Sequence, residues 1–484
     1  MASNHSYDAV IVGSGPNGLA AAITLARRGL RVQVIEGKDT IGGGCRSAEL
    51  TLPGYTHDVC AAVHPLALSS PFIQSLDLAA HGVNWIHPPV SLAHPLEENR
   101  AVLIHPSLVF TAASLGEDAA AYSQLMQPLV DRFHDLIAYL LSSLRIPKAP
   151  FKLAGFGLRA LRSADGLARA QFKTEEARAV FAGMAAHGMI PLENAGTASF
   201  GLVLAMAAHA VGWPLARGGS QSIVEAMAAI LRGHGGEIVT GQMITSLEEL
   251  PPSRVVLLDV APQNLLKITG DKLPSSYRDR IQRYRYGQGV FKVDWALSSP
   301  IPWANPAVKE AGTVHLGGTL EEIAASERAV AAGKQPEKPY VLLVQPSLFD
   351  NSRAPEGCHT AWAYCHVPNG STLDMRQSIE QQVERYAPGF KQTILAASTM
   401  NAAEYELYNP NYIGGDINNG AQDLGQLFTR PLLRWDSYAT PMKGVYLCSS
   451  ATPPGGGVHG MCGYLAACSA LKKDFPELYP HEKR

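Results

Sequence analysis

The chain has 484 residues, 46% of them apolar, which is enough for two or three domains that each bury a core. A formal net charge of −2 gives no general attraction to nucleic acid, so nucleic-acid binding is not expected. The seven cysteines contain no C-x-x-C pair and no zinc-type spacing, which predicts a reducing compartment and no structural metal.

Residues 8–47 carry the strongest local pattern, DAVIVGSGPNGLAAAITLARRGLRVQVIEGKDTIGGGCRS. Residues 9–12 form a short apolar run typical of a buried parallel strand, and Gly13, Gly15 and Gly18 follow it in G-x-G-x-x-G spacing. A helical pattern comes next and leads to a second strand over residues 31–35, which stops at Glu36. The order strand, glycine turn, helix, strand and acid predicts a dinucleotide site.

Each residue type in this pattern has a physical reason. Gly13 permits the tight turn, Gly15 lets backbone N–H groups approach a pyrophosphate, and Gly18 lets the helix lie close to the sheet. The N-terminus of the helix favours the negative charge of the phosphates. Glu36 can accept both ribose hydroxyls of an adenosine and would repel a 2′-phosphate.

The rest of the chain alternates between two styles. Helical patterning dominates residues 116–210, and residues 291–297, 341–344 and 360–367 read as strands of an antiparallel sheet. The α/β style of the N-terminus returns between these regions, with a helix over 220–231 and strands over 237–247 and 254–260. We therefore expect one domain over 1–64, 212–286 and 431–484, and a second over 65–211 and 287–430.

Location and partners are less sharply marked. The first strand begins near residue 8, which leaves no room for a signal peptide, and no apolar run of about 18 residues exists, so a cytoplasmic protein is expected. Residues 145–173 are rich in Lys and Arg, and two readings stay open: a solvated helical face, or peripheral contact with anionic lipid. A homo-oligomer also stays open.

The apolar helix expected over residues 200–211 is too short to span a membrane. It is expected to be a buried core helix, with the wall of a substrate channel as the alternative. His187 and His209 lie in apolar helical sequence and are expected to be core histidines with satisfied hydrogen bonds. His57-Asp58 is expected to be structural or to contact a flavin through its backbone.

The C-terminal stretch repeats the glycine spacing at Gly455, Gly457 and Gly460, after a strand over residues 445–449. A second dinucleotide domain is excluded because Pro453-Pro454 separates these glycines from the strand and too little chain follows for another strand and its acid. The better interpretation is a glycine loop against a flat ligand, followed by a helix whose N-terminus stabilises negative charge on it. A flavin fits this description.

These motifs, with the segments GWPLARGGSQSI and NPNYIGGDINNGAQDLGQLFTRP, resemble the phytoene desaturase-related flavoproteins, and within them the phytoene dehydrogenase-like branch. The resemblance implies an α/β fold in which a Rossmann-like FAD-binding domain joins a discontinuous α+β substrate domain, built from a helical insertion and an antiparallel sheet as in amine oxidases. It also implies non-covalent FAD and no metal. The cofactor-binding residues it implies are Gly13, Gly15, Gly18, Glu36, Gly43, Gly44, Arg46, Ile244, Gly456, Gly457, Val458 and Met461.

The function expected on this basis is an FAD-dependent oxidoreductase, a desaturase or dehydrogenase. It would move a hydride from a small apolar, lipid-like or polyketide-like substrate to flavin N5, with oxygen or a quinone as the final acceptor. His459, in the flavin loop, and Asp416, in the glycine-flanked GGDI segment, are the candidate catalytic residues. The alternatives are a flavin-dependent double-bond isomerase or saturase, and a non-catalytic interaction protein that FAD stabilises.

Overall fold

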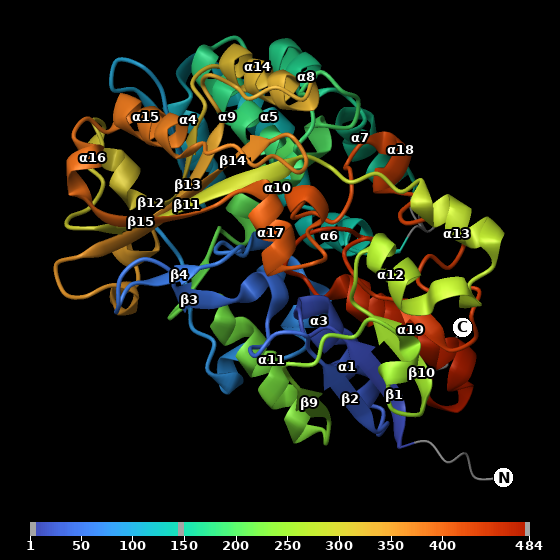
Figure 1. Ribbon diagram of the computed structural model, residues 1–484. Coiled ribbons are helices and arrows are strands. Elements are labelled where there is room, and N and C mark those ends of the chain that lie inside the picture. Colours follow the sequence, from blue (N-terminus) through green and yellow to red (C-terminus); the bar gives the residue numbers. More distant parts are fainter. Residues whose placement is uncertain (1–5, 144–149, 480–484) are drawn as a thin grey trace.

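Two separate β-sheets organise the molecule, as Figure 1 shows for the computed structural model, which describes residues 6–143 and 150–479. A five-stranded sheet lies in the half that carries the N-terminus, and a seven-stranded sheet lies in the other half. The chain passes between the two halves several times, so that each half combines segments far apart in sequence. The fold class predicted from the sequence is confirmed.

The five-stranded sheet is entirely parallel, with the order β16-β10-β1-β2-β9. Its central strand is apolar from Ala9 to Val12 because both faces are covered there: Ala9 and Ile11 face one core, whereas Val10 and Val12 face another. Helices α1, α11 and α19 supply the first core, and α12 and α13 supply the second. The bounds are β1 Tyr7–Val12, β2 Val32–Ile35, β9 Glu237–Val239, β10 Ser253–Leu258, β16 Val445–Leu447, α1 Pro16–Ala26, α11 Gln221–Gly233, α12 Pro262–Thr269, α13 Ser275–Gln282 and α19 Met461–Asp474.

The seven-stranded sheet has the order β15-β11-β14-β13-β12-β6-β7 and is antiparallel except at the β12–β6 pair. One of its faces packs against α15 and α16 through a cluster that includes Trp295 and Phe390, whose rings meet edge to face. The other face looks toward the five-stranded half. The bounds are β6 Val90–Pro95, β7 Ala101–Ile104, β11 Gly289–Leu297, β12 Ala311–Leu316, β13 Val341–Val344, β14 His359–Val367, β15 Ile394–Met400, α15 Arg376–Tyr386 and α16 Phe390–Thr393.

A layer of helices from the middle of the chain covers one end of this sheet (Figure 1). The layer includes α10, whose buried residues join the same core as α1 and α9, as expected for the apolar run near residue 200. Among the residues the structure describes, no helix is long and apolar enough to cross a membrane. The bounds are α4 Leu108–Ser114, α5 Ala119–Val130, α6 Phe133–Leu140, α7 Pro150–Ala160, α8 Ala164–Gln171, α9 Glu175–Ala185, α10 Ala198–Ala210 and α14 Leu320–Ala331.

The strands of the two sheets fall in different segments of the chain. Every strand of the parallel sheet lies within 1–64, 212–286 or 431–484, and every strand of the seven-stranded sheet lies within 65–211 or 287–430. The strand expected over 237–247 is shorter than predicted and ends at Val239. It ends there because Gly241, with φ of 73°, turns the chain back toward the end of β2.

Candidate active site

One large cavity of about 620 Å³ connects the two halves of the molecule. It begins at the carboxyl ends of β1 and β2, where Gly13 and Glu36 lie, and passes the C-terminal glycine loop at Gly457. It ends under the seven-stranded sheet at Trp362. Ligands of open parallel sheets bind at this edge of the strands, so the place of the cavity is that of a dinucleotide site.

The glycine turn after β1 is shaped as the sequence predicts. Gly13 adopts φ of 101°, and Pro16 occupies the first turn of α1, where its missing N–H costs nothing. A Cβ on Gly18 would stand 2.0 Å from the carbonyl oxygen of Gly13, so this glycine is required for the helix to approach the strand. A Cβ on Gly43 would stand 3.0 Å from Cα of Gly15, which brings the two glycine clusters into contact.

Glu36 occupies the end of β2, and its carboxylate is fully hydrogen-bonded by the protein. Oε2 accepts from the backbone N–H and the hydroxyl of Ser14, at 3.0 and 2.5 Å. Oε1 accepts from the backbone N–H of Lys38 and from the guanidinium of Arg46, both at 2.9 Å. A carboxylate offers about four acceptor positions, so a ribose hydroxyl could bind Glu36 only by exchanging with Ser14 or Arg46.

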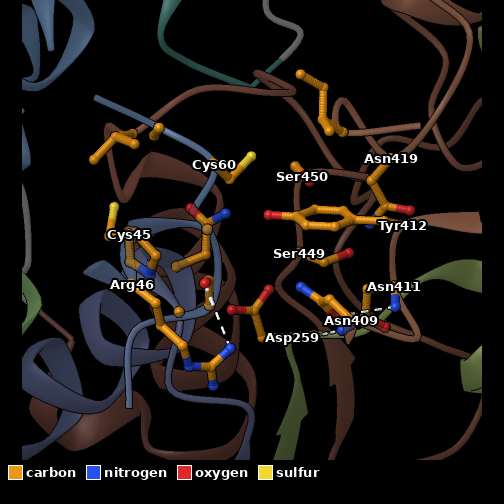
Figure 2. Close-up of a pocket in the computed structure, with 18 of the residues that line it drawn as sticks. Cys45, Arg46, Cys60, Asp259, Asn409, Asn411, Tyr412, Asn419, Ser449 and Ser450 are labelled. Atoms are coloured by element: carbon orange, nitrogen blue, oxygen red, sulfur yellow. Dashed lines mark hydrogen bonds between the residues drawn. The ribbon is translucent and has the colours of Figure 1, made fainter. Parts of the chain in front are cut away.

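Asp259 is a site residue that the sequence analysis missed. It follows β10 directly, and its Oδ2 accepts a hydrogen bond of 2.9 Å from the N–H of Gly18 in the first turn of α1. It lines the cavity beside Gly15, and Figure 2 shows its carboxylate near the centre of the lining residues. Burial, with a further contribution from the charge of Glu36, raises the pKa of Asp259 to about 7.

The C-terminal loop presents Gly457 and Val458 to the cavity. His459 is buried behind them: its Nε2 lies 3.2 Å from the carbonyl oxygen of Gly455, and its Nδ1 accepts from the N–H of Met461 at 3.0 Å. Both ring nitrogens are thus engaged within the loop, and burial lowers the pKa of His459 to about 4. The catalytic role expected for His459 stays a prediction, and this arrangement shows the histidine holding the loop.

Asp416, the other catalytic candidate, is buried below a turn in the half that carries the seven-stranded sheet. Its carboxylate accepts hydrogen bonds from the N–H groups of Gly287, Asn418 and Gly420, at 2.7, 2.8 and 2.7 Å. Its neighbours Asn418 and Asn419 line the cavity. Asp416 therefore shapes a turn that reaches the cavity, and its catalytic role also stays a prediction.

Residues 408–412, which follow the last strand of the seven-stranded sheet, lie against the glycine clusters. The rings of Tyr408 and Tyr412 line the cavity, and a Cβ on Gly44 would stand 2.6 Å from the Tyr412 hydroxyl. Asn411 accepts the N–H of Ala261 at 2.8 Å, which ties this segment to the end of β10. Figure 2 shows Tyr412, Asn411 and Asn419 facing Arg46 and Asp259 across the site.

The roof of the cavity is one face of the seven-stranded sheet. Strand pairing places Asp294, Trp362, Val344 and Thr313 in one row across this face. The adjacent row contains Lys292, Tyr364, Leu342 and His315. The residues of this face that line the cavity are Trp362, Tyr364, Leu342, Val344 and Thr313. Leu204 of α10 and Trp213, just after this helix, line it as well. This end of the cavity, which we call the aromatic chamber, is mainly apolar.

Lys292 and Asp294 form a buried ion pair at the edge of the chamber, with Nζ to carboxylate distances of 2.5 and 2.6 Å. The ammonium group also lies 5.4 Å from the centre of the Trp362 ring. Burial raises the pKa of Asp294 to about 6, although Lys292 opposes the shift. Sequence analysis missed this pair, whose K-x-D spacing on a strand places both side chains on one face.

His187 is hydrogen-bonded to His315 at 3.0 Å, as expected, but its place at the cavity wall was not predicted. It lies on a short 3-10 turn over Ala186–Gly188 and lines the cavity beside Trp213. His209 is confirmed as a satisfied core histidine, with hydrogen bonds of 2.8 Å to the Tyr122 hydroxyl and 3.0 Å to the carbonyl oxygen of His105. The place of His187 at the cavity was not predicted because the sequence of a helical layer does not show which of its ends faces the sheet.

Nine of the twelve predicted cofactor residues line the cavity, and three lie behind it. Gly18 packs α1 against β1, Gly456 packs against Asn418, and Met461 begins α19. The residues that line the cavity are Gly13, Gly15, Glu36, Gly43, Gly44, Arg46, Ile244, Gly457 and Val458. The open space over the glycines, an acid at one end and the glycine loop at the other are what a long dinucleotide requires, so these residues fit FAD.

Two further predictions concern metals and membranes. Within 6–143 and 150–479, no cluster of acidic, His and Cys side chains could hold a metal ion. Of the basic segment 145–173, residues 145–149 lie outside the described range. Arg169 pairs with Asp165 and Glu321, and Lys173 pairs with Glu117. These ion pairs reduce the charge available to lipid, and membrane contact stays a prediction.

The fold and the site together define a dinucleotide-binding protein with a second half built on the seven-stranded sheet. Residues 11–76 match the family model of the NAD(P)-binding Rossmann-like domain. An oxidoreductase from Methanosarcina mazei shares the fold with a TM-score of 0.63 and 16% identity, over 96% of this chain and 100% of the other. Wild-type putrescine oxidase bound to putrescine shares it with a TM-score of 0.62 and 18% identity, over 96% and 99%.

The sequence relatives extend over the same length. The chain is 28% identical to the pyridine nucleotide-disulfide oxidoreductase domain-containing protein 2 of Rattus norvegicus and of Mus musculus, over 95% of this chain and 92% of each relative. The resemblance indicated by the sequence motifs is thereby confirmed across nearly the whole chain. The phytoene dehydrogenase-like branch named above is the one that includes these proteins.

Proposed function

We propose that this protein is an FAD-dependent oxidoreductase that oxidises an uncharged, apolar substrate in the aromatic chamber. The observation that carries the proposal is the single cavity that joins the dinucleotide turn at Gly15 to the chamber at Trp362. An adenosine at Glu36 and a flavin ring beside Gly457 and Val458 would lie within that one space. The names of the relatives and of the fold neighbours, which include oxidoreductases and an oxidase, support the same class of reaction.

When bound, FAD supplies an acceptor for a hydride from a substrate carbon. The protein itself positions the substrate and excludes water. Trp213, Trp362 and Tyr364 enclose apolar substrate on the roof side, and a near-attack geometry depends on this packing. The first turn of α19, which follows the glycine loop, has backbone N–H groups directed toward the loop, where negative charge is stabilised.

Disulfide chemistry, which the relatives' name mentions, finds little support in this chain. All seven cysteines are free thiols. Cys45 and Cys60 line the cavity, but burial raises the pKa of both thiols, which keeps them protonated and weakly nucleophilic. The proposed substrate is therefore a carbon compound and the proposed bond broken is a C–H bond.

The test is direct. The purified full chain should bind FAD with flavin absorption near the usual visible bands, and this absorption should bleach during anaerobic incubation with an extract of apolar metabolites and return when oxygen or a quinone is added. Product analysis by mass should show the loss of two hydrogens. A protein that stays colourless after incubation with excess FAD would overturn the proposal.

A matched pair of variants gives the control. Gly15→Ala places a methyl group 3.1 Å from Oδ2 of Asp259, in the space where the phosphates would approach, and should weaken FAD binding at least tenfold. Gly233→Ala, in α11, meets no neighbouring atom within 4 Å and should leave the affinity unchanged. Equal affinities in the two variants would count against FAD at this turn.

A further inference from the structure

His187 is held at the wall of the aromatic chamber by a second buried histidine. Its Nε2 lies 3.0 Å from Nε2 of His315, which extends from β12 in the roof. The edge of the Trp213 ring packs against His187, with ring centres 5.8 Å apart and planes at 80°. Met189, with φ of 53°, ends the turn in a conformation that non-glycine residues rarely adopt, so the surrounding structure fixes this turn firmly.

Both imidazoles of the pair are neutral. Burial lowers the pKa of His187 to about 3 and that of His315 well below its usual value, and neighbouring histidines add to both shifts. In a hydrogen bond between two neutral rings, one Nε2 carries the proton and the other accepts it. In the ring whose Nε2 donates, Nδ1 has no proton; in the ring whose Nε2 accepts, Nδ1 carries the proton.

The surroundings of His315 decide which ring donates. Its Nδ1 is buried and has no hydrogen-bond partner among the described residues. It points at α9, where a Cβ on Gly183 would come within 2.9 Å, so it faces a backbone CH group. A buried N–H without an acceptor is rarer and costlier than a bare lone pair, and therefore the His315 proton is on Nε2.

The tautomer of His187 follows. Its Nε2 accepts the His315 proton, so its own proton is on Nδ1. This Nδ1 forms no hydrogen bond within the described chain, and His187 lines the cavity. Thr313, two residues before His315 on the same face of β12, also lines the cavity and is 1% exposed, and its hydroxyl has no hydrogen-bond partner among the described residues. The indole N–H of Trp362, which is also buried without a partner among the described residues, is a third unsatisfied polar group in this mainly apolar chamber.

We propose that the N–H at Nδ1 of His187 binds a carbonyl or ether oxygen of the substrate. This inference rests on the proposed function and specifies its substrate as an uncharged oxygen-containing compound, in contrast to an amine. Among the described residues that line the cavity, the acids are Glu36 and Asp259, both at the dinucleotide end, so no carboxylate awaits an ammonium group in the chamber. Leu342 and the carbon atoms of the Trp362 ring add apolar surface to the same chamber.

Three probes of similar size test the proposal with the full chain. Acetophenone carries the oxygen, α-methylstyrene replaces C=O by C=CH2, and 1-phenylethylamine carries a cation. Binding is measured by perturbation of the flavin spectrum in the FAD-loaded protein and by tryptophan fluorescence, which Trp213 and Trp362 should report with or without flavin. The wild type should bind acetophenone about fivefold more tightly than α-methylstyrene, the usual worth of one neutral hydrogen bond.

The variants separate the hydrogen bond from packing. His187→Phe should remove the preference for the ketone, whereas His187→Asn, whose amide nitrogen can replace Nδ1, should retain most of it. His315→Phe should reduce the preference because His187 then loses the partner that fixes its proton. No preference in the wild type, an undiminished preference in His187→Phe, or tightest binding of the amine would each overturn the proposal. Absence of flavin binding would instead refute the proposed function. The tryptophan fluorescence titrations would still decide whether His187 binds the substrate oxygen.

Discussion

Asp259 places an ionisable group at the point where the phosphates of a dinucleotide would lie. Because burial raises its pKa to about 7, roughly half of the molecules without ligand carry a negative charge there at neutral pH. Bound phosphates would raise this pKa further, so the complex favours the protonated acid. We therefore expect the dissociation constant for FAD to rise by up to about tenfold per pH unit above pH 7 and to be flat below it.

The control for this pH dependence is Asp259→Asn. Its amide oxygen can still accept the N–H of Gly18, but the position no longer titrates. FAD affinity, measured by fluorescence quenching between pH 6 and 9, should be nearly independent of pH in this variant. A wild-type profile that is flat through pH 8 would show that Asp259 does not control binding.

The Lys292–Asp294 pair makes a prediction about stability. Both side chains are at most 5% exposed, so removing one partner leaves an uncompensated buried charge. Asp294→Ala should lower the free energy of unfolding by roughly 3–5 kcal/mol in urea at pH 7.5. Asp271→Ala is the control because Asp271, which pairs with Arg278, is 94% exposed, so its removal should have little effect. Similar losses in the two variants would contradict the prediction.

At the scale of elements, the contact between α1 and α19 joins the two glycine loops. Gly463 of α19 lies against the first turn of α1, and a Cβ there would stand 1.7 Å from the backbone oxygen of Asn17. Gly463→Ala should force the helices apart, destabilise the protein by roughly 1–3 kcal/mol and weaken FAD binding. Thermal melts with and without FAD would measure both effects. Retention of both in the variant would show that α19 can shift freely.

Elements with a local period were predictable, and contacts between distant elements were not. The β1–α1–β2 unit follows from consecutive residues, so its glycines and Glu36 could be placed from the sequence. The rows across the seven-stranded sheet depend on register between strands, which the sequence alone leaves open, and this is why the residues of the aromatic chamber could not be named. Asp259 was missed because the predicted strand over 254–260 included it, whereas β10 ends at Leu258 and leaves Asp259 at the edge where the ends of parallel strands meet.

At the scale of the whole molecule, Arg353 joins the two halves beneath the cavity. It is fully buried between Asp58 and Asp350, with nitrogen to oxygen distances of 2.9 and 3.0 Å. Asp58 also accepts from Ser47 and from the N–H of Ser220, so this network positions segments on both sides of the site. Burial opposes ionisation of Asp58, yet the Arg353 charge and these hydrogen bonds hold its pKa below the usual value. For Asp350, hydrogen bonds from Ser352 and from the N–H of Gly218, with the Arg353 charge, likewise outweigh burial and lower the pKa.

Arg353→Met should therefore cost roughly 3–5 kcal/mol of unfolding free energy at pH 7, since two buried carboxylates lose their counter-charge. The sign of the pH dependence follows from the lowered pKa values. In the wild type the carboxylates contribute stability above about pH 4, and this contribution is lost as the pH falls through their folded pKa values. In the variant the same carboxyls can protonate to avoid the unpaired charge, so the stability gap between the two proteins should narrow as the pH falls from 7 to 4.

Arg285→Met, which breaks an exposed pair with Asp423, is the control and should show no such narrowing. Urea unfolding at several pH values measures the gap, and a gap that is constant with pH would mean that Arg353 acts through packing and not through its charge.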